Sequence, residues 1–318
     1  MTLKIYIDGA EGTTGLQLKQ RLLSHSEVKI LDVDNSKRKN LNYKLEKFSN
    51  SDLIFLCLPD KEAKETVLEI KNKISSKKVI IDASSAHRVS KDWEYGFPEL
   101  KNNKRELIKG SNRISNPGCY PTGALSLIRP LVENNIIDKS CLLTINAISG
   151  YTGGGKKLVN FFSTNKDEKF FYYSTFLDHK HNKEIKEYSL LDKSPIFCPS
   201  VGAFPQGMAV SLPIHFDWFK NKVKGKDIFN IFNDHYDSDS LISVNSLNSE
   251  SQLNAQGFLS PEALIGTNNI DISIFSNDKL GQLWLIARLD NLGKGASGAA
   301  VQNMNIRFGF DENLGVCL

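Results

Sequence analysis

The sequence predicts an α/β protein whose N-terminal part is a doubly wound parallel sheet. Two observations lead to this fold class. Short apolar runs alternate with segments of helical periodicity, and a glycine-rich turn directly follows the first run. Such alternation is typical of a parallel sheet, whose strands are buried on both faces. The expected strands are residues 3–7, 28–33, 53–58 and 78–82, and the expected helices are 16–24 and 60–71.

The composition narrows the class of protein. A length of 318 residues suggests about two domains. With 40 basic and 36 acidic residues, the net charge of +4 is too small to indicate a nucleic-acid partner. No apolar run reaches the roughly 18–20 residues that a membrane span needs. The N-terminus lacks the features of a signal peptide, so we expect a cytoplasmic protein with a small-molecule substrate and no membrane partner.

The turn after the first strand carries glycines at every third position, namely Gly9, Gly12 and Gly15. Strand, glycine-rich turn and helix together place a pyrophosphate at a helix N-terminus in Rossmann-type domains. We therefore expect these glycines, with Thr13 and Thr14, to bind a dinucleotide. The spacing departs from G-x-G-x-x-G, and an ordinary turn between a strand and a helix is the alternative.

The end of the second expected strand bears on the choice of cofactor. Asp34 suits the ribose hydroxyl of NAD. Ser36, Lys37 and Arg38 suit the 2′-phosphate of NADP, because hydroxyl and cationic groups bind phosphate. The basic cluster favours NADP (NADPH), with Ser36 and Arg38 as ligands.

One of the five cysteines stands apart from the others. Cys57 and Cys141 lie in apolar runs typical of buried strands, Cys198 in a proline-flanked loop, and Cys317 next to the C-terminus. There is no CxxC pair, so we expect no metal site. Cys119 lies among two prolines and two glycines in residues 116–123, which indicates a specified turn. A helix is expected to begin at Pro121, and its dipole would favour the reactive thiolate of Cys119.

A general base must accompany such a nucleophile. His179 and His181 are the best candidates, and we prefer His181 because Glu184 lies three residues further, on the same face of a helix. His25 and His235 are expected at the surface. The structural alternative for each histidine is a solvent-exposed helix residue.

These motifs jointly resemble N-acetyl-gamma-glutamyl-phosphate reductase in its shorter form, and more widely the aspartate-semialdehyde dehydrogenase superfamily. The matching stretches occur in family order and are residues 7–15, 82–88, 96–100, 116–123, 149–156, 179–184 and 291–305. Lys183 replaces a proline that family members often carry, without loss of a chemical group.

The resemblance implies a two-domain enzyme of arginine biosynthesis that forms dimers or tetramers. An NADP-binding Rossmann domain would comprise residues 1–115 and 291–318, and its C-terminal helix would return to it. Residues 116–290 would form an α+β catalytic and dimerisation domain with a mixed sheet. Cys119 would be the nucleophile that forms a thioester, and His181 the acid/base. The remaining expected site residues are Asn291 and Gly295 for the cofactor, and Arg88, Arg113, Asn116, Ser149, Gly150 and Glu184 for the substrate.

Three rival interpretations remain open from the sequence. Residues 150–157 nearly match a phosphate-binding loop of nucleoside triphosphatases, but Lys157 replaces the magnesium-binding hydroxyl and no clear helical stripe follows. We therefore expect this loop to shape the substrate pocket, and residues 157–173 to be a surface segment. An aspartate-semialdehyde dehydrogenase would use the same mechanism on a shorter substrate. A non-catalytic NADP-binding sensor is the third possibility.

Overall fold

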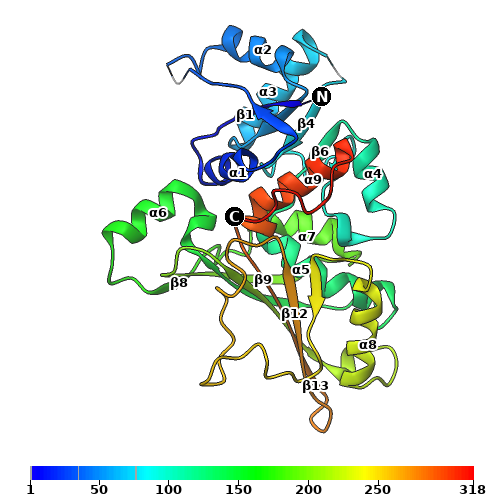
Figure 1. The fold of residues 1–318 in the computed structure, drawn as a ribbon. Helices are drawn as coiled ribbons and strands as arrows, with labels where there is room; N and C mark the ends of the chain where they lie inside the picture. The colour runs from blue at the N-terminus through cyan, green and yellow to red at the C-terminus, as the bar shows by residue number, and fades with distance from the viewer. Residues whose placement is uncertain (1, 35, 76) are drawn as a thin grey trace. The chain divides into compact units, whose positions relative to one another are not determined.

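The computed structural model describes residues 2–34, 36–75 and 77–318, and the chain divides into two compact units (Figure 1). The first unit comprises Met1–Pro117 and Ala296–Leu318, and the second comprises Gly118–Gly295. The sequence placed the domain boundaries after residues 115 and 290. The chain thus enters the second unit one residue before Cys119 and leaves it after Gly295.

The first unit is built on a six-stranded sheet in the order β2-β1-β3-β4-β6-β5, and its neighbouring strands are parallel. The parallel strands and intervening helices confirm the predicted fold class. Its strands are β1 (Leu3–Asp8), β2 (Val28–Ile30), β3 (Leu53–Leu56), β4 (Val79–Asp82), β5 (Glu94–Tyr95) and β6 (Arg113–Ser115). Its helices are α1 (Thr13–Leu23), α2 (Leu41–Asn50), α3 (Asp60–Lys73), η1 (Pro98–Leu100), α4 (Lys104–Gly110) and α9 (Gly298–Phe308).

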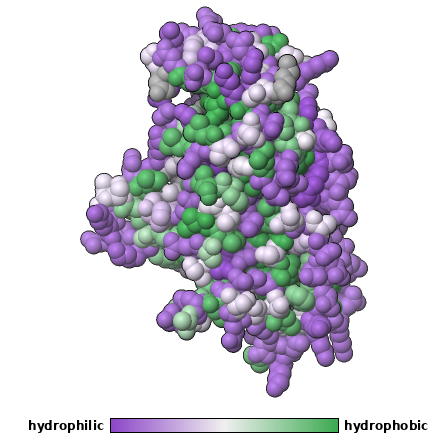
Figure 2. Space-filling view, in the orientation of Figure 1, coloured by the Kyte–Doolittle hydropathy of each residue, from purple (hydrophilic) through white to green (hydrophobic). Residues whose placement is uncertain are grey.

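Helices cover both faces of this sheet, because successive side chains of a strand point to opposite faces. On one face, Ile5 and Ile7 of β1 pack in an apolar cluster with residues of α1, α4 and α9. On the other face, Tyr6 packs with residues of α2 and α3. The outward surface of α2 and α3 is mostly hydrophilic (Figure 2). The first unit is therefore a three-layer α/β/α domain of Rossmann type.

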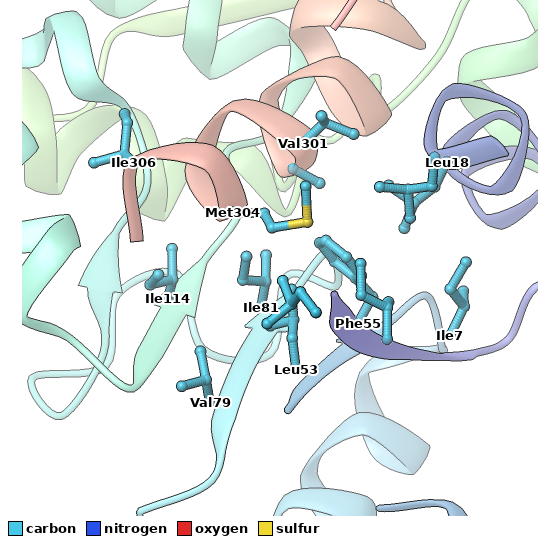
Figure 3. Packing of buried hydrophobic residues seen from close by; sticks show 14 of the residues in the cluster. Ile7, Leu18, Leu53, Phe55, Val79, Ile81, Ile114, Val301, Met304 and Ile306 are labelled. Atoms are coloured by element: carbon cyan, nitrogen blue, oxygen red, sulfur yellow. The ribbon is translucent and has the colours of Figure 1, made fainter. Parts of the chain in front are cut away.

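Helix α9 closes the first face of the sheet, although about 180 residues separate it in sequence from β6. Val301 and Met304 are both fully buried, and Met304 points toward Phe55 and Ile81 of the sheet (Figure 3). The small residues Gly298, Ala299 and Ala300 precede Val301, and they let this end of the helix approach the strands closely. The last helix of the chain is thus part of the core of the first unit.

The second unit is built on a seven-stranded mixed sheet in the order β11-β12-β13-β10-β7-β9-β8. The pairs β7–β9 and β11–β12 are parallel, and the remaining pairs are antiparallel. Its strands are β7 (Thr144–Gly150), β8 (Phe170–Tyr172), β9 (Ile196–Gly202), β10 (Met208–His215), β11 (Ile242–Val244), β12 (Ile270–Asn277) and β13 (Gln282–Leu289). Its helical segments are α5 (Cys119–Glu133), η2 (Tyr151–Gly154), α6 (Gly155–Thr164), α7 (His181–Ser189), η3 (Phe216–Trp218) and α8 (Gly225–Tyr236). A π-helical turn, η4 (Gly293–Ser297), precedes α9.

One face of the second sheet is covered and the other is open. Along β10, buried residues alternate with more exposed ones, as expected for a sheet with a single covered face. Helix α5 packs against β10 and β13, and α8 packs against β11 and β12. The covered face therefore carries the helix that begins at Cys119.

The sequence left residues 157–173 as a surface segment without a clear helical stripe, and the structure has regular elements there. Helix α6 follows the loop, and β8 lies within residues 157–173. Aromatic contacts hold this helix against the glycine-rich loop and β8. The ring of Phe162 stacks on Tyr151 at 5.1 Å and on Phe171 at 5.6 Å.

Two further expectations are corrected by long-range contacts. Cys198 lies in β9, not in a loop; β8 pairs with β9 only from Ser200 onward, so the adjacent proline lies where one edge of the strand is open. His25 is buried, not exposed, because residues from the C-terminal part of the chain cover it. Its Nε2 lies 3.0 Å from Oδ1 of Asn305, and its ring lies 5.6 Å from that of Phe310.

Truncation of Met304 should test the contribution of α9 to the first unit. Met304→Ala removes a fully buried side chain from the cluster in Figure 3 and should lower the free energy of unfolding by about 2–5 kcal/mol. Urea unfolding followed by circular dichroism measures the change. Leu23→Ala, on the exposed surface of α1, is the control and should change stability by less than about 0.5 kcal/mol. Equal stability of the two variants would contradict this role of α9.

Candidate active site

The glycine-rich turn after β1 has the close backbone packing that a phosphate-binding turn requires. Gly9 has a φ of +89°, and a Cβ there would lie 2.3 Å from the carbonyl oxygen of Cys57. A Cβ at Gly15 would lie 2.4 Å from the carbonyl oxygen of Gly9. Gly12 precedes the first residue of α1, Thr13, and has no side chain to cap the helix. The turn therefore presents backbone at the start of a helix, where anions bind.

A cavity of about 910 Å³ adjoins this turn within the first unit. Residues of the turn, the segment after β2 and the start of the following helical region line it. Among them are Gly9, Gly12, Asp32, Arg38, Lys39 and Lys44. The lining carries both signs of charge: the cations Lys19, Arg38, Lys39 and Lys44, which suit phosphates, and the acids Asp8, Glu11, Asp32 and Glu62. Arg38 lines the cavity, as expected for a ligand of a 2′-phosphate.

Ser36 is engaged by the neighbouring acid. Its hydroxyl and backbone N–H donate to Oδ1 of Asp34 at 2.6 and 2.9 Å, and Nζ of Lys37 lies 3.5 Å from the same carboxylate. The hydrogen bonds from Ser36, and then Lys37, lower the pKa of Asp34. Asp34 is thus an exposed, ionised side chain with its own partners.

The loop after β4 carries Arg88 at the carboxyl edge of the first sheet, where ligand-binding loops of parallel sheets lie. The buried Arg88 donates from Nε to the carbonyl oxygen of Asn116 at 2.9 Å, and from Nη2 to that of Ala83 at 3.1 Å. The side-chain amide of Asn116 donates to the carbonyl of Ala296 at 2.8 Å and accepts from Asn303 at 3.1 Å. Arg88 and Asn116 are therefore held together at one edge.

Arg113 lies at the first position of β6, toward the other edge of the sheet. Its Nη1 donates to the carbonyl oxygens of Lys78 and Asn112. Burial lowers the pKa of its guanidinium. The structure does not bring Arg113 together with Arg88 at the carboxyl edge.

Cys119 is the first residue of α5, with Gly118 as the N-cap. The sequence predicted that the helix begins at Pro121, with Cys119 just ahead of it. The helix begins two residues earlier, at Cys119 itself. Cys119 is half-buried, and the backbone of Gly295 packs directly on it, since a Cβ on Gly295 would lie 2.6 Å from Cβ of Cys119. The thiol therefore lies at the positive end of a 15-residue helix, which favours the thiolate.

Two other cysteines have the opposite environment. Burial, with smaller contributions from Asp82 and Asp8, raises the pKa of the Cys57 thiol to about 12. Burial also raises the pKa of Cys141. Both thiols are therefore protonated near neutral pH. The expectation of buried strands is corrected, because Cys57 directly follows β3, and Cys141 precedes β7 and is only partly buried.

Helix α7 begins at His181, and its first turn is bound to the turn that carries the nucleophile. Oε1 of the buried Glu184 accepts a hydrogen bond from the backbone N–H of Gly118 at 2.7 Å. The ring of His181 lies 5.9 Å from that of Tyr120, the residue after Cys119. The structure thus brings Cys119, His181 and Glu184 together on the covered side of the second unit.

The environment of His179 differs from that of His181. Nδ1 of His179 accepts the backbone N–H of His181 at 3.1 Å, so this nitrogen carries a lone pair. Nε2 of His179 lies 3.3 Å from the hydroxyl of Tyr173. Burial raises the pKa of Tyr173, so this hydroxyl stays protonated. His179 is consequently bound through both ring nitrogens to groups of the protein itself.

The glycine-rich loop after β7 is fixed by a small polar network. Asn291 accepts the N–H of Gly207 at 2.7 Å and donates to the hydroxyl of Thr152 at 3.1 Å. Gly150 donates its N–H to the carbonyl of Gly207 at 2.9 Å, and a Cβ there would lie 2.6 Å from the backbone nitrogen of Gln206. The buried Ser149 donates to the carbonyl of Gly150 at 3.1 Å. These groups shape the loop.

Sequence reasoning missed Tyr120, Tyr173 and Asp290 near these groups. Tyr120 is buried and donates to the carbonyl of Ser200 at 3.1 Å, and burial raises its pKa. The buried Asp290 accepts from Gln206 at 2.7 Å and from the N–H of Gly266 at 2.9 Å. Its position directly before Asn291 was the only local signal, whereas Tyr173 lies in the segment that the sequence left as a surface region.

The described ranges contain no cluster of three histidine, cysteine or acidic side chains that would hold a metal ion. None of the helices in those ranges has the length and hydropathy to cross a membrane.

Comparisons with known proteins agree with this architecture. A family model described as "Semialdehyde dehydrogenase, NAD binding domain" matches residues 4–109, and one described as "Semialdehyde dehydrogenase, dimerisation domain" matches residues 119–291. Solved structures of aspartate semialdehyde dehydrogenase II from Vibrio cholerae and of a probable aspartate-semialdehyde dehydrogenase from Pseudomonas aeruginosa are similar in fold, with TM-scores of 0.67 and 0.72. Each is 13% identical in sequence, and each match covers 97% of this chain and 99% of the other. This likeness concerns the fold alone.

Sequence relatives are much closer than these structures. A protein of Trichormus variabilis named N-acetyl-gamma-glutamyl-phosphate reductase is 41% identical over 321 residues, covering 98% of this chain and 99% of the relative. One of Brucella ovis with the same name is 39% identical over 314 residues, covering 97% and 100%. The likeness runs through both units and confirms the resemblance that the motifs predicted. The chain therefore belongs to the N-acetyl-gamma-glutamyl-phosphate reductase family.

Proposed function

We propose that this protein reduces N-acetyl-L-glutamyl 5-phosphate to N-acetyl-L-glutamate 5-semialdehyde with NADPH, releasing phosphate, as a step of arginine biosynthesis. The observation that carries the proposal is the junction of α5 and α7. There the hydrogen bond between Gly118 and Glu184 brings the nucleophile turn next to the helix that starts at His181. Family membership supplies the substrate class, and the active-site geometry supplies the chemistry.

The first unit fits a dinucleotide with phosphates. Gly9 and Gly15 leave room only for backbone, which lets a pyrophosphate approach the start of α1 at Thr13 and Thr14. The adjoining cavity of about 910 Å³ has the size of a cofactor site, and Arg38 gives it positive charge. We assign the pyrophosphate to the turn and the 2′-phosphate to Arg38, with Ser36 beside it. When bound, NADPH supplies the hydride that reduces the acyl group.

Cys119 supplies the covalent step. Its thiolate attacks the carbonyl carbon of the acyl phosphate, a carbon–sulfur bond forms, and the carbon–oxygen bond to phosphate breaks with phosphate as leaving group. The backbone N–H groups at the start of α5 stabilise the oxygen on which negative charge develops. The resulting thioester divides one difficult reaction into two easier ones.

His181 moves the proton in the second step. It donates a proton to the carbonyl oxygen as the thioester is reduced, and takes it back when the carbon–sulfur bond breaks and the aldehyde leaves. We assign this role to His181 and not to His179, because both ring nitrogens of His179 are used by His181 and Tyr173.

The other expected site residues fall into two roles. We retain Arg88 as the partner of a substrate anion, since a guanidinium at the carboxyl edge matches a carboxylate or a phosphate. Arg113 is left out, because it lies at the first position of β6, toward the other edge of the sheet. The remaining residues make hydrogen bonds or close backbone contacts within their own units, and we propose that they position loops: Asn116, Ser149, Gly150, Glu184, Asn291 and Gly295.

The name of the matched domain model supports self-association of the chain. We propose a homodimer through the open face of the second sheet. This face has a cavity of about 540 Å³, and among its lining residues Tyr172, Phe258 and Trp284 are half or more exposed. An open apolar face of this kind is typical of an interface. The cytoplasmic location predicted from the sequence stays a proposal.

A reverse assay should identify the substrate. With NADP+ and phosphate, N-acetylglutamate semialdehyde should give a rise in NADPH absorbance, with a kcat/KM roughly 100-fold or more above that for aspartate semialdehyde. The acetyl group and the additional methylene distinguish the two aldehydes. A preference for aspartate semialdehyde would retain the mechanism and replace the substrate. Inactivity with both, in enzyme that binds NADPH, would favour the sensor.

Replacement of the nucleophile should separate chemistry from binding. Cys119→Ser should lower kcat by roughly 10³-fold or more, because the alcohol is not ionised at neutral pH. Its dissociation constant for NADPH, measured by fluorescence titration, should stay within about twofold of the parent. Cys317→Ser, at an exposed position, is the control and should keep full activity. More than a tenth of the parent activity in Cys119→Ser would rule out the thioester.

Charge placed on the open face should disrupt the homodimer. Trp284→Arg introduces a cation at a position that is 50% exposed in the isolated chain, so burial of this residue in an interface would become unfavourable. Light scattering after size exclusion should give the dimer mass for the parent and the monomer mass for the variant. The control is Leu68→Arg on α3, 57% exposed in the first unit, which should stay dimeric. A dimer with Trp284→Arg would place the interface elsewhere.

A further inference from the structure

An ion pair lies beside the glycine-rich turn, in a place that the sequence did not single out. Nζ of Lys44 is 2.5 Å from Oδ2 of Asp8, and the side chains are 17% and 7% exposed. Both residues line the cavity of about 910 Å³. Asp8 is the last residue of β1 and directly precedes Gly9. A carboxylate therefore lies one residue from the turn assigned to the pyrophosphate.

The fold directs Lys44 to this point. Asn40 caps α2 by accepting the N–H of Tyr43 at 3.0 Å, so Lys44 lies in the first turns of the helix. Its Nζ lies 5.7 Å from the ring centroid of Phe48, a buried residue of the same helix. Asp8 faces this helix because it lies two residues after Tyr6, on the same face of β1. A lysine stem packed in this way holds its charge at a fixed place.

The other titratable groups around Asp8 do not neutralise it. Burial, followed by the charge of Asp8, raises the pKa of Tyr6 on β1, with a smaller contribution from Tyr43 on α2. Burial, followed by the charges of Asp82 on β4 and of Asp8, raises the pKa of Cys57 beyond β3 to about 12. Tyr6 and Cys57 are therefore protonated and uncharged near neutral pH. The cation paired with Asp8 is Lys44.

An anionic Asp8 would oppose a bound dinucleotide. Two like unit charges at an assumed separation of about 8 Å, with an effective dielectric constant of about 20, change a binding constant roughly thirtyfold. Burial raises the pKa of Asp8, and Lys44 lowers it again, so the lysine keeps the pair close to neutral in total charge. Without Lys44, the carboxyl group would be either protonated or repulsive, depending on pH.

We propose that Lys44 is a positioning residue of the dinucleotide site, which neutralises the Asp8 carboxylate so that the phosphates of NADPH can approach the turn at Gly9. The inference rests on the proposed cofactor. It extends that proposal because it assigns a role to a residue of α2 outside the glycine-rich turn and outside the basic cluster at Arg38.

Calorimetric titration with NADPH between pH 6 and pH 9 tests the proposal without any turnover. Lys44→Met keeps the stem and removes the charge, and should bind NADPH roughly thirtyfold more weakly than the parent at pH 9. The loss should become smaller as the pH is lowered, because burial raises the pKa of Asp8 and removal of Lys44 takes away the charge that opposes this rise. At each pH, the dissociation constant of Lys44→Met is divided by that of the parent. The titration of the cofactor phosphate affects both constants and cancels in this ratio.

Two further variants isolate the charge of Asp8. Asp8→Asn with Lys44→Met should bind NADPH within about threefold of the parent, at a ratio that does not change with pH. Lys47 lies in the next turn of α2, and its Nζ is 5.1 Å from the ring centroid of Tyr43. Lys47→Met removes this cation and should leave the affinity for NADPH within about twofold of the parent at every pH. Thermal unfolding of each variant without cofactor confirms that it is folded.

The outcomes separate this inference from the proposed function. If the parent protein does not bind NADPH, the cofactor assignment is overturned together with the role of Lys44. Tight binding by the parent with a pH-independent loss in Lys44→Met, or failure of Asp8→Asn to restore the double variant, would overturn the role of Lys44 alone. A loss in Lys47→Met equal to that in Lys44→Met would reduce the effect to general positive charge and would likewise overturn it.

Discussion

The hydrogen bond from the N–H of Gly118 to Glu184 is the contact on which the catalytic arrangement depends. It is short, at 2.7 Å, and its acceptor is a buried carboxylate, so its loss would leave an anion without one of its donors. Gly118 is the N-cap of α5, and Glu184 lies in the first turn of α7. The bond thereby joins the starts of two helices, and Cys119 and His181 are the first residues of those helices.

Steric limits complete what this bond begins. Gly295 lies against Cys119, and any side chain there would overlap its Cβ, so the wall behind the nucleophile is bare backbone. In the other unit, the carbonyl oxygen of Cys57, after β3, closes in Gly9, and the carbonyl oxygen of Gly9 closes in Gly15. At Gly9, Gly15 and Gly295 there is no space for a side chain, so glycine is required. Gly9 also has a positive φ, which favours glycine. Close approach of backbone is what a thioester pocket and a phosphate turn both require.

The sequence predicted those parts of the protein that are encoded locally. Glycine spacing, the apolar runs of the first sheet and the turn around Cys119 rest on neighbours in the chain, and their structures follow the prediction. The burial of His25 depends on a partner far away in sequence, Asn305, and local patterns do not contain that information. For the same reason the engagement of Arg113 by backbone carbonyls was not foreseen: the residue type was correct for an anion, but its place in β6 was decided by strand pairing.

Charge at the buried positions follows one rule, and the rule explains why the site residues divide as they do. A buried charge is tolerated only with a partner. Glu184 has a backbone N–H, Asp8 has Lys44, and Arg88 has two carbonyl oxygens. Each partner fixes the orientation of a segment next to a proposed ligand. These paired charges hold the segments that carry the groups assigned to contact ligands. This separation between positioning and contacting groups is the physical basis for assigning catalysis to Cys119 and His181 alone.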